Sequence, residues 1–286
     1  MASFRSKTRK LKGGAVSPTV DSLQQTSWSY HRENSMKASH LIDALHPWLD
    51  AKLGVSLDSA GSDPVPVCER GLVTTRPEWV EALGPIVSRL SLDELFSTFG
   101  AYELARVLLP DGFGVWGPSW YFVGDDDCFC PVQDARPVRL EADELAEKID
   151  RRIFWHCFPD QALVGFGIYD ENKLIAVASV RAEGNGPWEI GMDVSLEAKR
   201  RGLGRAVVSA AGSWILAHNR LILATTAPWN VPSARTLCSV GLQFVMSDMS
   251  AMPGPFRVPP QPLGSPYPGV EMHNYYPDWA INKDIK

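Results

Sequence analysis

The sequence has no long apolar run, few cysteines, and no cysteine pair at the spacing typical of metal or redox sites. Its longest mostly apolar stretch, 206–217, is interrupted by serine and glycine and is shorter than the roughly 20 residues that a membrane-spanning helix needs. Five cysteines are an odd number, and none forms Cys-x-x-Cys. This predicts reduced thiols. No apolar signal segment opens the chain. Together these absences predict a cytoplasmic protein with no membrane partner.

Two common phosphate-binding motifs are also missing. No Gly-x-x-x-x-Gly-Lys-Ser/Thr run occurs, and the Gly-x-Gly at 202–204 leads to Val207 where a dinucleotide-binding motif needs Gly or Ala. Cys128 and Cys130 have no histidine pair nearby, which disfavours zinc. The acidic run at 125–127 lacks the remaining oxygen ligands of a calcium loop and is better interpreted as a turn. We therefore predict no metal site.

Composition and charge are those of an ordinary globular protein with an uneven charge distribution. The 286 residues are 45% apolar and 21% charged, enough for one large or two modest domains. The net charge is −5, but the first twelve residues hold five bases and no acid, so the rest carries 23 bases against 33 acids. Such an acidic body argues against a nucleic-acid partner. The basic start is typical of a solvated disordered tail, with a targeting segment or an interaction arm as alternatives.

The order of the expected elements predicts a mixed α/β sheet in the second half of the chain. Apolar runs there give β-β-β-α-β-α-β, with two strands in 162–183 and then, in order, strand 186–195, a helix within 198–216, strand 221–227, helix 232–241 and strand 242–249. The first half predicts helices within 36–53, 76–90, 91–109 and 141–158, and two short strands around Gly117–Pro118.

The stretch AKRRGLGRAVVSAAGSWIL, residues 198–216, combines a basic, glycine-containing loop with the start of a helix. Backbone N–H groups at a helix start have no partner inside the helix, and with the helix dipole they favour an anion such as phosphate. Glycines at 202 and 204 allow close backbone approach, and the flanking bases attract the anion. The segment therefore predicts a phosphate-binding loop.

This loop and a second motif resemble the GCN5-related N-acetyltransferase (GNAT) superfamily. The family's pyrophosphate loop reads [QR]-x-x-G-x-[GA], which residues 199–204 match with Lys in the first place. The family's later element is an Asn that starts a short helix, then Ser or Ala, then Gly-Phe; here Asn230, Ser233, Gly241 and Leu242 occupy those places. With the preceding hairpin, the resemblance covers about residues 160–248. It implies a largely antiparallel GNAT-like sheet with flanking helices.

The resemblance implies acetyl-CoA, or another acyl-CoA, as co-substrate, and no metal. The pyrophosphate would bind the loop, the pantetheine arm would pair with the edge of strand 188–194, and the second element would contact the pantetheine or the thioester. The cofactor-binding residues implied in this way are Met192, Val194, Lys199, Arg200, Arg201, Gly202, Leu203, Gly204, Arg205, Asn230 and Ser233.

The family's chemistry is direct attack of an amine on the thioester, which needs a base and an oxyanion donor. Glu189, on the central strand, resembles the base position of several members, and Asp193 is a weaker candidate. Alternation along the strand equally allows a surface-facing Glu189 without a catalytic role, with Glu189, Gly191 and Asp193 on one face and Trp188, Ile190 and Met192 on the other. The N–H of Val194 is the expected oxyanion donor.

The general acid is where the sequence departs from the family. Many members carry a tyrosine at the place of Leu237. Tyr275 and Tyr276 are alternatives, although aromatic residues that pin a tail to the core explain them better. We expect Cys238 to pack on its helix and His156 to pack beside Trp155. His218, near a helix C-terminus, is expected to be structural.

We therefore predict an acyl-CoA-dependent N-acyltransferase, most simply an acetyltransferase that acts on a primary amine of a small molecule. The alternatives are a non-catalytic acyl-CoA-binding regulatory module and a protein lysine or N-terminal acetyltransferase; a homodimer is left open. The expected organisation is a disordered tail (1–35), an α+β region that caps the acceptor site (36–158), the acyl-CoA-binding domain (159–250), and a proline- and aromatic-rich extension packed on the core (251–286).

Overall fold

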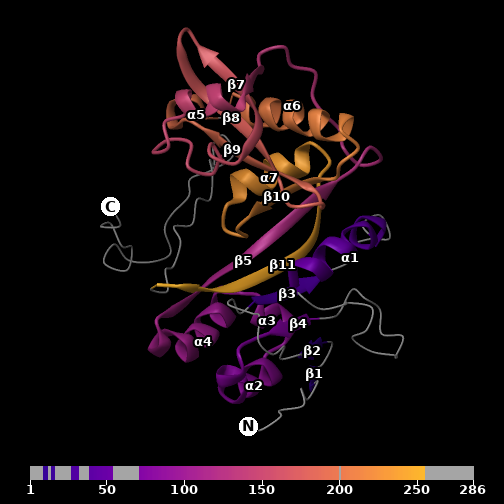
Figure 1. The fold of residues 1–286 in the computed structure, drawn as a ribbon, viewed down its shortest axis with the longest axis vertical. Helices are drawn as coiled ribbons and strands as arrows, with labels where there is room; N and C mark the ends of the chain where they lie inside the picture. Colours follow the sequence, from indigo (N-terminus) through magenta and orange to yellow (C-terminus); the bar gives the residue numbers. More distant parts are fainter. Residues whose placement is uncertain are drawn as a thin grey trace, which may run out of the picture.

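Figure 1 shows the fold in a computed structural model, which describes residues 9–11, 14–16, 27–31, 39–53, 71–199 and 201–254. The strands are β1 (Arg9–Leu11), β2 (Gly14–Val16), β3 (Ser27–His31), β4 (Gly71–Thr74), β5 (Phe113–Gly124), β6 (Val138–Glu141), β7 (Ala162–Asp170), β8 (Lys173–Ala182), β9 (Trp188–Val194), β10 (Ile222–Thr226) and β11 (Gln243–Pro253). The α-helices are α1 (Ser39–Leu53), α2 (Val80–Arg89), α3 (Leu92–Leu95), α4 (Thr98–Leu108), α5 (Ala142–Lys148), α6 (Leu203–Ala217) and α7 (Val231–Ser239).

One sheet joins all the described strands, in the order β1-β2-β4-β3-β11-β5-β10-β9-β8-β7-β6. Within the described residues, β9–β10 and β2–β4 pair in parallel and the other neighbours are antiparallel. The order β7-β8-β9-α6-β10-α7-β11 is the predicted one. The expected fold class, a mixed and largely antiparallel sheet with flanking helices, is confirmed.

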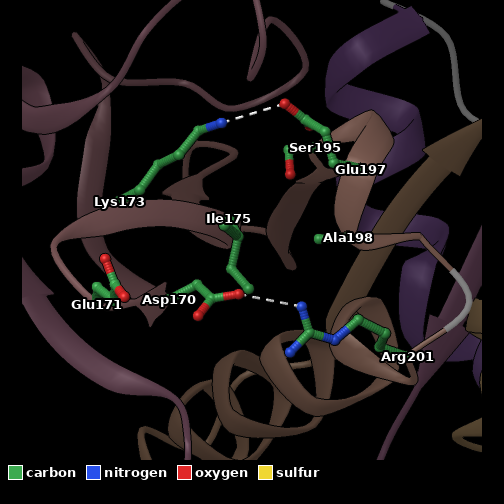
Figure 2. Close-up of a pocket in the computed structure, with 8 residues that line it drawn as sticks. All are labelled: Asp170, Glu171, Lys173, Ile175, Ser195, Glu197, Ala198 and Arg201. Carbon is green, nitrogen blue, oxygen red and sulfur yellow. Dashed lines mark hydrogen bonds and ion pairs between the residues drawn. The ribbon is translucent and has the colours of Figure 1, made fainter.

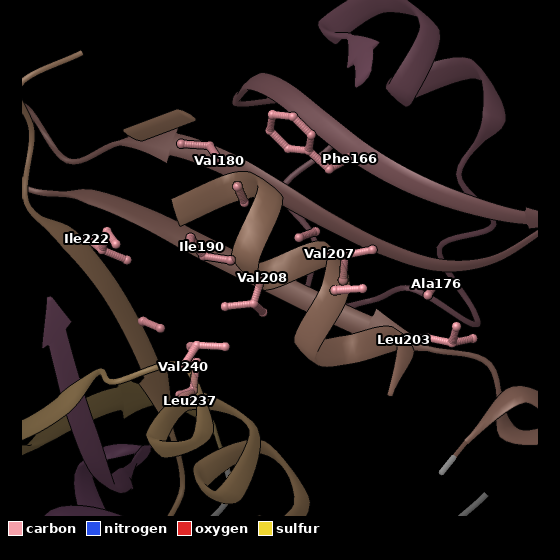
Figure 3. Packing of buried hydrophobic residues seen from close by; sticks show 14 of the residues in the cluster. Phe166, Ala176, Val180, Ile190, Leu203, Val207, Val208, Ile222, Leu237 and Val240 are labelled. Atoms are coloured by element: carbon pink, nitrogen blue, oxygen red, sulfur yellow. The ribbon is translucent and has the colours of Figure 1, made fainter. Parts of the chain in front are cut away.

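Alternation along the strands divides the helices between the two faces of the sheet. On β8, Ala176 and Ala178 belong to the core under α6, whereas Val177 faces α5 with Leu145. Figure 3 shows α6 lying across the strands, with Val207 and Val208 pointing into this core. Helix α1 packs on the face opposite α6 and α7, against alternate residues of β5 and β10, and α2 and α4 pack at the far ends of β5 and β11. None of the helices in the described ranges is long and apolar enough to cross a membrane.

The predicted helix 141–158 is much shorter in the structure. Helix α5 ends at Lys148, and residues 149–161 run as turns over the face of β8 and β9 that α6 leaves open. The Asp150 carboxylate accepts a hydrogen bond from the Arg152 backbone N–H, and the Asp150 carbonyl accepts one from Ile153. Such local bonds compete with the helical ladder, so the prediction was wrong beyond Lys148.

Two further predictions are corrected by the strands. Instead of two short strands around Gly117–Pro118, a single strand β5 runs through this dipeptide, and its register with β11 shifts there. A bulge of this kind tolerates a proline, which has no N–H to donate. Disorder was predicted through residue 35, yet β3 pairs with β11 over five residues. The alternation in Ser-Trp-Ser-Tyr was the period-two signal of that strand.

The sheet also crosses the predicted boundary at 158/159. Strand β5 lies between β11 and β10, and β6 pairs with β7, so strands of the predicted cap continue the sheet of the predicted acyl-CoA-binding domain. The division of the chain into a cap and a transferase domain stays a prediction. Residues 255–286, expected to pack on the core, lie outside the described part of the chain.

Candidate active site

The predicted phosphate-binding loop connects β9 to α6. Gly202 adopts the left-handed conformation (φ +73°), which favours glycine, and helix α6 begins directly after it at Leu203. No side chain caps this helix start, so its first N–H groups point out of the helix without an intrahelical partner. The Leu203 side chain is buried in the core, which leaves its backbone as the group that faces outward. Arg200 lies outside the described residues.

Gly204 brings the start of α6 close to the end of β9. A Cβ built at Gly204 would lie 3.3 Å from Met192 Sδ and 3.5 Å from Val194 Cγ2. Three of the predicted cofactor-binding residues therefore lie together, around the first turn of α6. Lys199 and Arg205 are exposed on either side of this turn. The described part of the loop thus has the backbone and the charge that a phosphate requires.

The charged side chain of Arg201 is turned away from β10. Its Nη1 lies 3.2 Å from Asp170 Oδ2, and Lys173 pairs with Glu197 at 3.1 Å, so two ion pairs link the β7–β8 turn to the loop region. A hollow of about 290 Å³ lies in this region, and Figure 2 shows Ile175 between the two pairs among the residues that line it. The hollow lies at the β7–β8 side of the loop, whereas the helix start and β10 lie on the other side. Arg201 thus pairs with Asp170 across the surface, and its part in cofactor binding stays a prediction.

Strands β9 and β10 diverge after two paired residues. Their parallel register covers Ile222↔Trp188 and Leu223↔Glu189. The Trp188 N–H donates to the Leu221 carbonyl, and because backbone groups alternate sides along a strand, those of Ile190, Met192 and Val194 face the same side. Beyond the paired residues these groups line an open edge of β9. This edge can accept an added strand-like chain, as predicted for the pantetheine arm.

The second predicted element starts α7. Asn230 is the N-cap of this helix, and its Oδ1 accepts a hydrogen bond from the Ser233 backbone N–H at 3.3 Å. Both residues are half-buried. Leu237, at the usual tyrosine position, is buried in the core beneath α7 and supplies no polar group. Cys238 is exposed rather than packed, which corrects that expectation. Tyr275 and Tyr276 lie outside the described residues.

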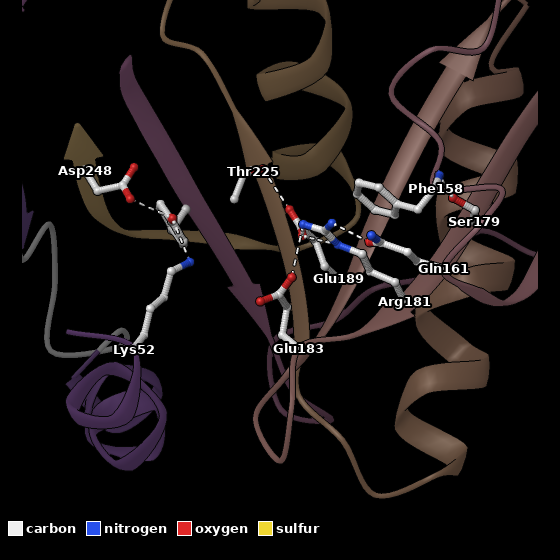
Figure 4. Close-up of polar contacts among 10 residues, drawn as sticks. Lys52, Phe158, Gln161, Ser179, Arg181, Glu183, Glu189, Thr225 and Asp248 are labelled. Carbon is white, nitrogen blue, oxygen red and sulfur yellow. Dashed lines mark hydrogen bonds and ion pairs between the residues drawn. The ribbon is translucent and has the colours of Figure 1, made fainter. Parts of the chain in front are cut away.

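As they diverge, β9 and β10 form a fork, which is closed where the two strands are paired and open beyond that point. Glu189 lies at the closed end of this fork. It is 4% exposed, yet its carboxylate has three donors: Arg181 Nε (2.9 Å) and Nη2 (2.5 Å) on Oε2, and Thr225 Oγ1 (2.8 Å) on Oε1. Figure 4 shows these partners with Glu183, which also pairs with Arg181. The predicted base therefore has both oxygens engaged, and its position ties β8, β9 and β10 together.

The same face of the sheet carries a second polar group. The Tyr121 hydroxyl donates to Asp248 Oδ2 at 2.8 Å and accepts from Lys52 Nζ at 3.3 Å (Figure 4). Asp248 is partly exposed as a residue, but burial of its carboxyl group raises its pKa to about 6. Burial and the neighbouring Asp248 also raise the pKa of Tyr121. Sequence analysis missed this group, because it joins residues from α1, β5 and β11 that no local pattern connects.

Arg181 was missed as well, although the sequence held a signal. The second and third predicted strands, β8 and β9, join through a turn at Glu183–Gly186, and the structure pairs Arg181 with Glu189 across it. Opposite charges at equal distances from a hairpin turn face one another on one side of the sheet. The faces themselves were predicted correctly: Ile190 and Met192 contact the α6 core, whereas the Glu189 side faces away from it.

Asp193 holds His156 near the open end of the fork. Its Oδ2 accepts from the His156 backbone N at 2.8 Å, and its Oδ1 lies 2.6 Å from His156 Nδ1. The expectation that His156 only packs beside Trp155 is therefore incomplete, although the two rings do lie in contact, tilted by 32° with centroids 3.5 Å apart. The His218 ring bonds the Trp214 carbonyl at the end of α6, at the far end of the helix from the loop.

The acidic run forms the predicted turn. Asp125 Oδ1 accepts hydrogen bonds from the backbone N–H groups of Asp127 and Cys128. Within the described ranges, His40, Asp125 and Asp127 form the one group of three side chains whose ligand atoms lie within 4.8 Å of one another. The His40 ring already bonds Asp125 at 2.8 Å, so the turn has a structural use without an ion.

Residues 126–239 match the family model of the acetyltransferase (GNAT) family. The chain carries a GNAT acetyltransferase domain. The family and the N-acetyltransferase class predicted from the loop and the second element are thereby confirmed, and the match extends toward the N-terminus beyond the predicted resemblance. No curated protein sequence matches the chain.

Solved structures of GNAT proteins are similar to this chain at low sequence identity. A GNAT-family acetyltransferase from Colwellia psychrerythraea is 12% identical, with a TM-score of 0.40 over 51% of this chain and 60% of that one. A GCN5-related N-acetyltransferase from Kribbella flavida is 17% identical, with a TM-score of 0.38 over 53% and 64%. The aminoglycoside N-acetyltransferase AAC(6')-Iy in complex with CoA is 16% identical, with a TM-score of 0.30 over 37% and 86%. This chain thus spans under two thirds of the first two.

Proposed function

We propose that this protein transfers the acetyl group of acetyl-CoA to a primary amine of a small molecule. The observation that carries the proposal is the fork between β9 and β10, which opens a strand edge directly beside an uncapped helix start with exposed bases. The edge suits the amide-bearing pantetheine arm, and the helix start suits the pyrophosphate. Together with the family match, this favours an acyl-CoA donor.

Different residues in and around the fork bind different parts of acyl-CoA. The backbone N–H groups of residues 203–205 and the side chains of Lys199 and Arg205 bind the pyrophosphate. The backbone edges of Met192 and Val194 align the pantetheine, and the Val194 N–H faces the open edge where the thioester oxygen gains charge. Asn230 and Ser233 border the β10 side through α7.

Glu189 is better suited to hold the fork together than to accept a proton. Its two oxygens accept three hydrogen bonds, two of them from a guanidinium that neutralises the carboxylate. A base must reach the proton that it abstracts, and these donors occupy that position. We therefore propose Glu189 as a positioning residue.

The acceptor enters from the face that α6 and α7 do not cover. On that face, α1 contacts β5 and β10, and residues 154–158 contact β8 and β9, so the approach to the fork is flanked on two sides. This favours a small amine over a long protein tail. The net negative charge of the chain after its basic start distinguishes less well between acceptors, since it would also suit a lysine-bearing peptide.

Two measurements test the proposal in turn. Acetyl-CoA should raise the free energy of unfolding, by about 2.7 kcal/mol at 100 times its dissociation constant. CoA release should then be followed with acetyl-CoA and a panel of diamines, polyamines, aromatic amines and amino sugars, with a lysine-bearing peptide as a separate arm. Turnover with a small amine supports the proposal, and turnover with the peptide alone supports protein acetylation.

A non-catalytic acyl-CoA-binding module is the second candidate, because Leu237 stands where many family members have a tyrosine acid. Stabilisation by acetyl-CoA without CoA release for any amine would favour it. No stabilisation and no turnover would contradict both candidates. The cytoplasmic location and the homodimer stay predictions.

A further inference from the structure

The segment that follows α5 fixes a histidine over the end of β9. The backbone crosses β9 at Gly191, where a Cβ would collide with the His156 carbonyl and lie 3.0 Å from the Phe158 ring. The Phe158 N–H donates to the buried Ser179 Oγ at 3.0 Å, and the His156 N–H donates to Asp193. Hydrogen bonds to two strands therefore hold this short segment in place.

Asp193 also fixes the His156 ring. The carboxylate accepts hydrogen bonds only, so the 2.6 Å contact requires a proton on Nδ1, and in the neutral imidazole the lone pair is then on Nε2. The Asp193 side chain is 12% exposed and the His156 side chain 40% exposed. A buried carboxylate thus orients a more accessible imidazole, which is the arrangement of a general base and its positioning residue.

The pair lies at the open part of the fork. Asp193 stands between Met192 and Val194, whose backbone groups face the open edge, and its side chain lies on the face that α6 leaves uncovered. Glu189 is four residues back, or roughly 13 Å along the strand, at the closed end. An amine that approaches a thioester on this edge therefore meets the His156 side of the fork.

We propose that His156, positioned by Asp193, is the general base and then the general acid of the acetyl transfer. This assignment rests on the function proposed above. His156 Nε2 takes a proton from the substrate ammonium. The amine nitrogen then forms a bond to the thioester carbonyl carbon, and the carbon–sulfur bond breaks. The imidazolium returns its proton to the CoA thiolate, and the second amine proton leaves to solvent. This supplies the acid that Leu237 does not.

The described titratable groups around His156 are less suited to act as the base. Asp193 contacts the ring from β9. Cys157, in the same segment, is buried, which raises its pKa to about 12 and keeps it a thiol. Further along the face, Arg181 and Glu189 pair with each other. An acid limb in the pH–rate profile that depends on the His156 ring is therefore the signature of this role.

The test compares variants of the full chain, with acetyl-CoA and the best amine of the panel as probes. His156→Gln should lower kcat about 100- to 1,000-fold, abolish the acid limb, and leave acetyl-CoA affinity within twofold. Asp193→Asn should lower kcat about tenfold and move the acid limb to lower pH, because the imidazolium loses its anionic neighbour. His218→Gln is the matched control and should retain wild-type turnover.

A second measurement tests the assignment in case His156→Gln folds poorly. His156→Ala should regain at least tenfold turnover when free imidazole is added, and the circular dichroism spectrum should report its fold. Wild-type turnover that persists in His156→Gln, or an acid limb that survives it, overturns the assignment and leaves the acetyltransferase function intact. Absence of turnover in the wild type with every amine overturns the proposed function and the assignment together.

Discussion

Replacing Arg181 with methionine tests whether the fork depends on its buried ion pair. Arg181 donates twice to Glu189 and lies over the Phe158 ring with its guanidinium carbon 3.9 Å from the ring centre. The Glu189 side chain is 6% exposed and that of Arg181 28%. Methionine keeps most of the apolar stem, so the variant removes the charge and its hydrogen bonds rather than the packing.

The expected loss of stability follows from the hydrogen bonds that the Glu189 carboxylate retains and loses in the variant. After the substitution, the Thr225 hydroxyl remains as a donor to Oε1, while Oε2 loses both of its hydrogen bonds. Breaking a buried ion pair from one side costs about 3–5 kcal/mol. Since Arg181 is partly exposed, we take the lower value, about 3 kcal/mol. For a chain of this size, that corresponds to a fall in Tm of roughly 6–12 °C.

Urea denaturation followed by circular dichroism measures the change. Arg139→Met is the matched control, because the Arg139–Glu141 pair is exposed on both sides and its loss should cost under about 0.5 kcal/mol. The double variant Arg181→Met/Glu189→Leu should recover most of the loss, since the carboxylate that still lacks Arg181, that of Glu183, is 26% exposed. A single variant within 1 kcal/mol of the wild type would refute the reasoning.

Three further results are expected. Gly212→Ala should destabilise the protein by about 1–3 kcal/mol in urea denaturation, because its Cβ would overlap the buried Phe129 ring; the exposed Ser213→Ala is the control, and equal stabilities would contradict this packing. Asp248→Asn should flatten the pH dependence of stability. The folded pKa of about 6 lies above the unfolded value of 3.8, so the stability that the protonated carboxyl group contributes is lost as pH rises through 6, and wild-type stability should gain about 2 kcal/mol over the variant as pH falls from 7 to 4; parallel pH curves would refute this. Cys157, buried and with its pKa raised to about 12, should resist iodoacetamide at pH 8 while exposed Cys130 reacts, as mass spectrometry would show. Equal labelling of the two would contradict the burial.

The elements whose signals are local were predictable from the sequence. Gly202 needs a positive φ, and the apolar runs around it repeat every two residues before the loop and at helical spacing after it. The phosphate-binding loop, the hairpin before it and the Asn230 cap therefore follow from short stretches of chain. The family was predicted from the resemblance of these motifs to those of the GNAT superfamily.

The polar contacts on the face that α6 leaves open were not predictable in this way. His156 and Asp193 are 37 residues apart, and Tyr121 and Asp248 are 127 apart, so neither pair leaves a local pattern. The turn that ends α5 at Lys148 also depends on a single carboxylate, that of Asp150, against an otherwise helical composition. Contacts between distant segments decide these features, and only the three-dimensional structure reveals them.

Acyl-CoA is proposed to lie along the open edge of β9 with its pyrophosphate at the start of α6. The most direct test is a titration of the ¹⁵N-labelled protein with CoA, followed by the backbone amide signals. The account predicts saturable shifts that are largest at Met192, Val194, Leu203, Gly204 and Arg205, the amides of the fork and the helix start. Shifts confined to the hollow around Asp170 and Lys173, or no saturable shift at all, would contradict it.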